Sequence, residues 1–218
     1  MNNSMEFLMW VKGPAFDFAL FIFICGITIR ILEIVILGRK QDLAAARSSQ
    51  EMGGLRNIFS RSMPEAGILK RAPFTVIMGY IWHIAWFISF LLFIPHIELF
   101  TALTGLAWPG LANQIVDFAA VVAIISLIAV LIHRITHPVL SFLSGFEDYL
   151  VWLVTFLPLF TGYLAFHHII EPYTLFLALH ILSAELLMVV FPFTKLMHAI
   201  TVVMARWYSG VSNGRKLA

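Results

Sequence analysis

Apolar residues occupy five long runs in this chain, separated by short polar or basic stretches. The runs cover residues 15–37, 74–104, 111–133, 148–167 and 173–206, and each meets the roughly 20 residues that a helix needs to cross a bilayer. Hydrophobic residues make up 61% of the 218 and charged residues 12%, which is more apolar surface than a soluble domain of this size can bury. The pattern predicts an all-α membrane protein, a single domain over 1–218 folded as a five-transmembrane-helix bundle.

The orientation of the chain is predicted by its basic residues, because lysine and arginine gather in cytoplasmic loops. The N-terminal segment and the turns after the second and fourth runs are expected on one side of the membrane. Lys12 is the only lysine or arginine on that side. The opposite side carries Arg39, Lys40, Arg47, Arg56, Arg61, Lys70, Arg71, Arg134, Arg206, Arg215 and Lys216. We therefore expect the N-terminus outside and the C-terminus in the cytoplasm.

The basic stretch between the first two runs, about 35 residues long, exceeds the length of a tight turn. It has two equally weighted interpretations. One is a basic amphipathic segment that lies on anionic lipid. The other is a docking surface for a peripheral subunit.

The fifth run contains His180 and His198, which lie 198 − 180 = 18 residues apart. In an unbroken helix this spacing makes about five whole turns, so both imidazoles leave one face about 27 Å apart, close to the roughly 30 Å of hydrocarbon. Each histidine could instead be a packing or headgroup-level residue. Because polar groups inside a bilayer are costly and usually functional, we interpret the pair as axial ligands of two stacked b haems.

Histidines in the second run could complete these two iron sites. Depth along the helices pairs His83 with His198 at an inner haem, and His96 with His180 at an outer haem. His96 follows His83 by 96 − 83 = 13 residues, which leaves it about 140° from the face of His83 in an ideal helix. A kink is therefore required, and Pro95 could cause it.

Other residues could replace His96 if it is only an interfacial side chain at a proline break. These alternative ligands are His167 and His168, at the outer end of the fourth run. The single cysteine, Cys25, excludes an intrachain disulfide, a covalent CxxCH haem site and an iron–sulfur cluster held by this chain alone.

Several segments resemble the γ subunit of respiratory nitrate reductase, a five-helix dihaem cytochrome b. The most specific is LHILSAELLMVVFPFTKLMH at 179–198, and AARSSQEMGGLRN at 45–57, Arg30 and SGFED at 144–148 are also similar. The wider family includes cytochrome b subunits of heterodisulfide-reductase-like and dissimilatory-sulfite-reductase-associated complexes. The family's histidine spacing in the second helix is shorter than thirteen, which is a departure at the outer haem.

The resemblance implies an electron-transfer subunit of a quinol oxidoreductase complex rather than a complete enzyme. Menaquinol would bind near the outer haem, and electrons would pass through both haems to a cytoplasmic iron–sulfur subunit of ferredoxin-like or CCG-domain type. It also implies a multi-pass protein of the prokaryotic cytoplasmic (inner) membrane, in contact with lipid and quinone and with no nucleic acid. The direction of electron flow is left open.

A quinol site needs an apolar slot, hydrogen-bond acceptors and a route for protons. Candidates on the outer side are Glu98, Asn113, Gln114 and Asp117, with His96, His167 and His168. For Glu98 and Asp117, solvation at the headgroup level is favoured over a role in proton transfer.

Cations near the inner helix ends could pair with the haem propionates. The candidates are Arg134, Lys195 and Arg206, which the charge asymmetry explains equally well. Arg30 and Glu33, three residues apart, are expected to form an ion pair. Glu185, about 140° from the face of His180, is expected to meet a partner chain.

Two other functions compete with the cytochrome. One is a haem-free membrane anchor for a catalytic subunit, which would leave the register of His180 and His198 to chance. The other is a proton or solute transporter with a histidine relay. The transporter is disfavoured because the sequence shows no paired broken helices and no inverted repeat.

Overall fold

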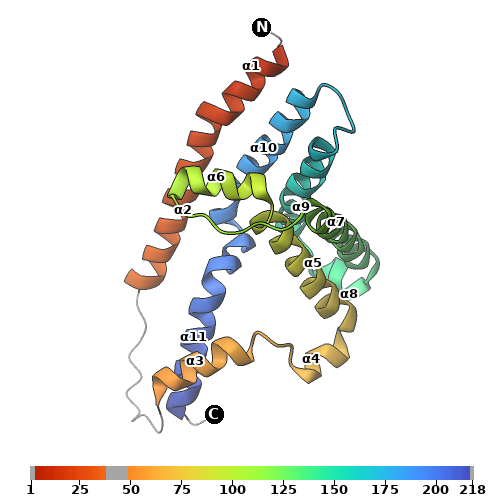
Figure 1. The fold of residues 1–218 in the computed structure, drawn as a ribbon. Coiled ribbons are helices and arrows are strands. Elements are labelled where there is room, and N and C mark those ends of the chain that lie inside the picture. Colours follow the sequence, from red (N-terminus) through yellow and green to blue (C-terminus); the bar gives the residue numbers. More distant parts are fainter. Residues whose placement is uncertain (1–2, 38–48, 217–218) are drawn as a thin grey trace. The chain divides into compact units, whose positions relative to one another are not determined.

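The fold comes from a computed structural model, which describes residues 3–37 and 49–216 (Figure 1). Of the residues in these two ranges, 86% are helical, and no strand occurs among them. Within them, five helices are long and apolar enough to cross a membrane: Asn3–Ile36, Pro73–Leu91, Asn113–Thr136, Phe146–Phe166 and Tyr173–Phe193. The all-α class and the five apolar spans are therefore confirmed. The bundle and the orientation stay predictions.

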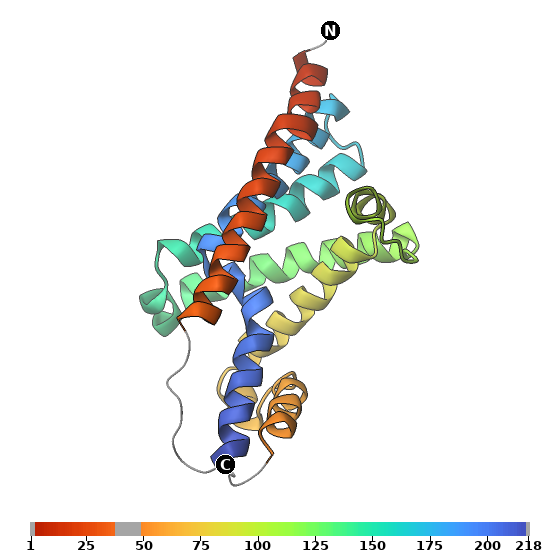
Figure 2. The ribbon, with the colours of Figure 1, turned by 90° about the vertical axis from the view of Figure 1, so that its left-hand side faces the viewer.

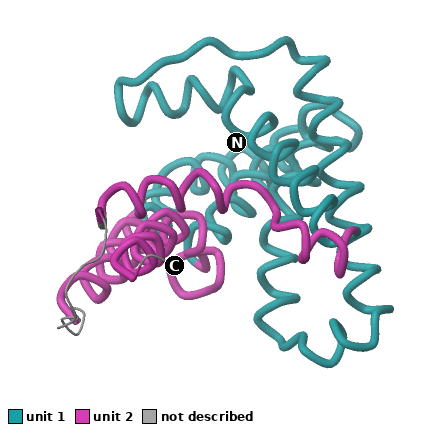
Figure 3. The backbone as a smooth tube through the Cα atoms, turned by 90° about the horizontal axis from the view of Figure 1, so that it is seen from below, with its two compact units in different colours: residues 1–20, 74–189 teal, residues 21–73, 190–218 magenta. Residues whose placement is uncertain are grey.

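The chain divides into two compact units, each made of segments that are far apart in the sequence (Figure 3). Unit 1 contains residues 1–20 and 74–189, and unit 2 contains residues 21–73 and 190–218. The single domain over 1–218 is not tested by this division and stays a prediction.

The first span is one continuous helix of three segments: α1 (Asn3–Trp10), the π-helical turn η1 (Val11–Ala15) and α2 (Phe16–Ile36). In unit 1, Leu8 and Val11 pack with Ala178 of α10 (Tyr173–Val190), and all three side chains are buried. α7 (Asn113–Thr136) packs against α9 (Phe146–Phe166), where Trp152 Nε1 donates to the Leu127 carbonyl at 2.8 Å. The short α8 (Pro138–Leu143) connects these two helices.

The second apolar run does not form one helix. α5 spans Pro73–Leu91 and α6 spans Ile94–Thr104, with Phe93 in an extended conformation between them. Pro95 lies in the first turn of α6, where its missing N–H leaves no helical hydrogen bond unmade. The chain turns sharply at this point (Figure 1). The predicted kink is therefore present, and residues 94–104 fall outside the second candidate span.

The fifth apolar run is also interrupted, so the prediction of one helix over 173–206 is wrong. α10 ends at Val190 and is followed by the 3-10 turns η2 (Phe191–Phe193) and η3 (Lys195–Met197), before α11 (His198–Lys216) begins. Pro192 lacks an N–H, and Thr194 is extended, which ends the α-helical hydrogen-bonding pattern. His180 and His198 therefore belong to different helices, and five whole turns of one helix do not relate their side chains.

Unit 2 contains a close helix pair that the sequence analysis did not foresee. α3 (Gln50–Ser60) lies along α11 (Figure 2). Asn57 Nδ2 donates to the Arg206 carbonyl at 2.7 Å, and Arg206 Nη1 donates to Ser62 Oγ at 2.9 Å. A Cβ atom at Gly53 would lie 2.5 Å from the carbonyl oxygen of Gly210, so glycine permits the approach of the two backbones.

The basic stretch therefore contains helices α3 and α4. The short α4 (Ala66–Arg71) directly precedes α5. Arg39, Lys40 and Arg47, which contribute to the predicted charge asymmetry, lie outside the described residues.

Candidate functional site

His96 and His180 lie together inside unit 1. His96 is in the first turns of α6, directly after the break that follows α5, and His180 is in α10. Their ring centroids are 6.1 Å apart, and the ring planes are inclined by 19°. The structure therefore brings together the two histidines that the sequence analysis assigns to the outer haem.

Both rings are held by a main-chain carbonyl on the Nδ1 side. His96 Nδ1 lies 3.0 Å from the Phe90 oxygen, and His180 Nδ1 lies 3.1 Å from the Pro158 oxygen. Because a carbonyl oxygen only accepts, each Nδ1 must carry the proton and each Nε2 keeps its lone pair. Metal-ligating histidines are oriented by the same kind of bond.

The surroundings of His96 are apolar. Phe90 and Phe93 pack against His96, with ring centroids 5.6 and 5.1 Å from its own. Burial lowers the pKa of the His96 imidazole below its ordinary value, and the hydrogen bonds to the Phe90 and Ser89 carbonyls only partly oppose this. His96 is therefore neutral near pH 7, the protonation state that a metal ligand requires.

On the α9 side, a glycine makes room for His180. A Cβ atom at Gly162 would lie 2.9 Å from Cε1 of His180, which is closer than Cβ contacts come. Thr161 Oγ1 lies 3.5 Å from His180 Nδ1 and 3.1 Å from Ser183 Oγ, and Ser183 Oγ donates to the His180 carbonyl at 2.7 Å. These contacts fix the position of the His180 ring between α9 and α10.

The two predicted ligands of the inner haem belong to different units. His83 is in the middle of α5 in unit 1, and its Nδ1 donates to the Gly79 carbonyl. His198 is the first residue of α11 in unit 2, where its Nδ1 donates to the Lys195 carbonyl at 2.7 Å. All four predicted ligands thus share the same bond from Nδ1 to a carbonyl. The pairing of His83 with His198 stays a prediction.

The alternative ligands have other contacts. His167, which follows the last residue of α9, places Nε2 at 2.6 Å from Asp117 Oδ1 of α7. The His168 ring stacks on Tyr173, with centroids 4.3 Å apart. Neither makes a hydrogen bond or ring contact with His180 in residues 3–37 and 49–216. In this geometry His96 is the neighbour of His180.

An apolar groove with one ionisable side chain lies along α6. Its volume is about 470 Å³, and it is lined by Ile94, Ile97, Glu98, Thr101, Ala102, Ala107, Trp108 and Gly110. The segment that follows α6 forms one wall of the groove, and two hydrogen bonds attach it to the end of α5. Trp108 Nε1 donates to the Leu91 carbonyl at 2.7 Å, and the Leu111 N–H donates to the Leu92 carbonyl at 2.9 Å. Of the predicted quinol contacts, Glu98 lines this groove. Asn113, Gln114 and Asp117 do not.

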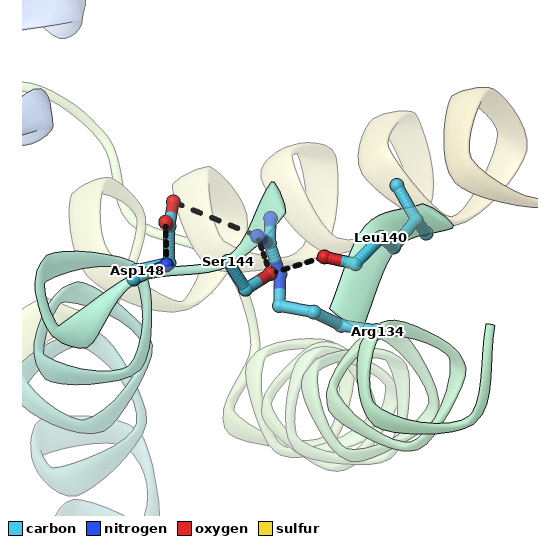
Figure 4. A network of polar contacts seen from close by, with 5 residues as sticks. Arg134, Leu140, Ser144 and Asp148 are labelled. Atoms are coloured by element: carbon cyan, nitrogen blue, oxygen red, sulfur yellow. Dashed lines mark hydrogen bonds and ion pairs between the residues drawn. The ribbon is translucent and has the colours of Figure 1, made fainter. Parts of the chain in front are cut away.

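Arg134, a predicted propionate partner, is part of a polar network at the start of α9 (Figure 4). Its Nη1 donates to Ser144 Oγ at 2.8 Å and lies 3.5 Å from Asp148 Oδ1. Asp148 Oδ2 accepts the Gly145 N–H at 3.0 Å, which caps the start of α9 with one side-chain bond, because glycine has no side chain to make the reciprocal one. The sequence signal for this cap is the spacing of Gly145 and Asp148, which the sequence analysis did not use.

The other two predicted propionate partners lie in unit 2. Arg206 joins α11 to Ser62 beyond the end of α3. Lys195 begins η3, three residues before His198. A role of Arg134, Lys195 or Arg206 toward a propionate stays a prediction.

Two further expectations concern charged residues of the spans. The ion pair of Arg30 and Glu33 is confirmed at 3.0 Å, and Arg30 Nε also donates to the Pro192 carbonyl at 3.1 Å, which satisfies an acceptor at the break in the fifth run. The Glu185 side chain is buried, with 4% exposed, and its expected contact with a partner chain stays a prediction.

In the part of the chain that the structure describes, no group of three or more His, Cys, Asp or Glu side chains is arranged to hold a metal ion. A haem iron needs at most two protein ligands, because the porphyrin supplies the other donors. The expected role of His96 and His180 as haem ligands stays a prediction.

Comparisons with known proteins add one distant relative. No protein-family model and no solved structure matches the chain. Over 142 residues it is 30% identical to a curated protein of Nitratidesulfovibrio vulgaris strain Hildenborough whose printed name is only "Protein". The match covers 65% of this chain and 62% of the relative, so the chain spans less than two thirds of the relative's length. The fold and composition are those of an all-helical protein with five candidate membrane spans in its described residues, which is compatible with a multi-pass membrane protein.

Proposed function

We propose that the chain is a membrane cytochrome b subunit that passes electrons between menaquinol and a cytoplasmic iron–sulfur subunit through two b haems. The observation that supports this most directly is the His96–His180 pair. These two histidines would hold the outer haem iron through the Nε2 atoms that keep their lone pairs, and their ring centroids lie 6.1 Å apart. Bound haem b would supply one-electron transfer.

The chain's own residues would prepare the outer site before the cofactor binds. The Phe90 and Pro158 carbonyls fix both Nδ1 protons, so the Nε2 lone pairs remain for the iron. Phe90 and Phe93 exclude water from the His96 side. His83 and His198 are proposed to hold the inner haem, on the basis of the sequence and of the same Nδ1 bonds.

The groove along α6 supports a quinol site beside the outer haem. Its volume of about 470 Å³ falls in the usual range for small-molecule pockets, and its walls are mostly apolar. Glu98 is the one carboxylate among the residues that line the groove. It follows His96 by two residues on α6. We assign Glu98 as the acceptor of a quinol hydroxyl proton.

We further propose the orientation and location that the charge pattern predicts. The N-terminus lies outside, and α3, α4 and α11 lie at the cytoplasmic face of a prokaryotic membrane, on the same side as the iron–sulfur partner. This places the described basic residues Arg56, Arg61, Lys70, Arg71, Arg215 and Lys216 on the cytoplasmic side of the inner membrane.

A haem assay tests this function. The purified chain, expressed in cells that make haem, is expected to show a b-type α band in a reduced-minus-oxidised spectrum and two haems per chain by the pyridine haemochrome assay. The band should bleach when the reduced protein is mixed with an oxidised menaquinone analogue. A colourless but folded preparation would exclude the cytochrome and favour the haem-free anchor.

Replacement of Glu98 by glutamine is expected to lower the rate of haem reduction by a menaquinol analogue about a hundredfold, because the groove loses its proton acceptor. The haem content should not change, since Glu98 is not a ligand. Asn113→Ala is the matched control, because Asn113 lies outside the groove lining and should keep the normal rate. Equal rates in both variants would remove Glu98 from the quinol site.

The breaks in the second and fifth runs bear on the transporter alternative. The sequence shows no paired broken helices, which disfavoured a transporter, whereas residues 3–37 and 49–216 contain a break in each of these two runs. Transporter breaks lie near the middle of the membrane. Here the first break follows the candidate span Pro73–Leu91, and the second overlaps the last three residues of the candidate span Tyr173–Phe193, so both lie at a span end. The breaks therefore give the transporter no support.

A further inference from the structure

α3 presents an apolar stripe on the side that α11 does not cover. Met52, Leu55 and Phe59 form this α3 stripe, and 65%, 46% and 74% of their surfaces are exposed. Gly53 and Asn57 face α11. Leu55 follows Gly53 by two residues, and Phe59 follows Asn57 by two. Two residues correspond to a rotation of about 200° around a helix. The α3 stripe therefore points away from α11, and these residues are not part of the packing within unit 2.

Basic residues outnumber acidic ones in the segment that carries the α3 stripe. From residue 50 to 71, the basic residues are Arg56, Arg61, Lys70 and Arg71, and the acidic ones are Glu51 and Glu65. Arg61 and Glu65 form an exposed ion pair at 3.4 Å, which leaves the excess of positive charge to the other side chains. A helix with an apolar face bordered by arginine has the composition of a segment that lies in a membrane interface.

The covalent chain keeps α3 close to a bilayer surface. α4 ends at Arg71, two residues before the span that starts at Pro73, and it exposes Ile68 and Leu69. Ser60 ends α3 and Ala66 begins α4, so the two ends are six residues apart and at most about 20 Å from each other. The stripe is therefore within reach of the headgroups that flank the second span.

We propose that the α3 stripe lies in the headgroup–acyl boundary of an anionic membrane leaflet, with α11 packed on its opposite side. An anionic leaflet matches both parts of the surface, because acyl chains cover Met52, Leu55 and Phe59 while phosphates attract the arginines. α11 fixes the rotation of α3 through the close glycine contacts, so the stripe is presented to lipid permanently. This inference does not depend on haem or quinol binding.

Nitroxide accessibility of the full chain tests the proposal. Cys25 is the single cysteine, so Cys25→Ala gives a background for single labels at Leu55→Cys and Phe59→Cys. Ser60→Cys is the matched control, because Ser60 is exposed and about 100° around the helix from Phe59. The proteins are reconstituted in vesicles of phosphatidylcholine with phosphatidylglycerol, and collisions with oxygen and with a water-soluble nickel chelate are measured.

The expected ratio of oxygen to nickel collisions is several-fold higher at positions 55 and 59 than at position 60, and it falls when phosphatidylglycerol is left out. Nickel access at 55 and 59 equal to that at 60 would place the stripe in water and overturn the proposal. Exclusion of both reagents would also overturn it, because protein rather than lipid would then cover the stripe. Circular dichroism of each labelled protein verifies that the helices are intact.

Discussion

Replacement of His180 by alanine is expected to lower the haem content from two to one per chain. The variant loses one of the two imidazoles whose centroids lie 6.1 Å apart, and the remaining His96 has no second imidazole within that distance among the described residues. His96→Ala should have the same effect for the same reason. Pyridine haemochrome quantification and a redox titration of the α band measure the loss, which should remove one of two redox transitions.

Two comparison variants make this result specific. His167→Ala should keep both haems, because the Nε2 atom of His167 already contacts Asp117. His198→Ala should remove the other, inner haem while the outer one is still reducible by quinol. If His180→Ala retained two haems, the outer site would be wrong. If His198→Ala retained two haems, the assignment of His83 and His198 to the inner haem would be wrong, and the outer site would be unaffected.

Replacement of Gly210 by valine is expected to separate α3 from α11. A Cβ atom at Gly210 would lie 2.5 Å from Cβ of Asn57 and 2.9 Å from the Cα of Gly54, and it would overlap the carbonyl oxygen of Gly53. Backbone atoms cannot yield as flexible side chains do, so the cost should reach or exceed the roughly 1–3 kcal/mol typical of an overpacked interior. Hydrogen exchange should become faster in residues 50–60.

Gly67→Ala is the control for this prediction. Gly67 lies in α4 of the same unit, and the nearest atom to its added Cβ is 4.0 Å away, at the end of the Glu65 side chain. Alanine favours a helix over glycine by up to about 1 kcal/mol, so this variant should exchange at the normal rate or more slowly. Normal exchange at 50–60 in Gly210→Val would show that the glycines do not hold the two helices together.

The sequence predicted the five apolar spans because length and hydropathy accumulate over about twenty residues and do not depend on any single contact. It did not place the break in the fifth run, although Pro192 was visible. Proline alone is an ambiguous signal: Pro158 lies inside α9 without ending it, whereas Pro192 coincides with two 3-10 turns. The difference lies in tertiary contacts, such as the bond from Arg30 to the Pro192 carbonyl.

The histidine pair shows a similar division. The sequence paired His96 with His180 from depth and expected a kink at Pro95, and the kink is present. The break after α5 reorients His96 and frees the Phe90 carbonyl that holds its Nδ1, and neither consequence follows from an ideal helix. The eighteen-residue register in the fifth run was the stronger argument at the sequence level, yet it depended on an unbroken helix that the chain does not form.

By itself, the sequence determined the class of protein, the number of apolar spans, the uneven distribution of positive charge and the histidines worth considering. These properties depend on composition and on local spacing, which a linear chain carries in full. Only the tertiary structure decided that His96 and His180 lie side by side, that Glu98 lines a groove while Asp117 contacts His167, and that α3 packs on α11. Each of these depends on where helices break and how closely their backbones approach, and those are set by contacts between residues far apart in the chain.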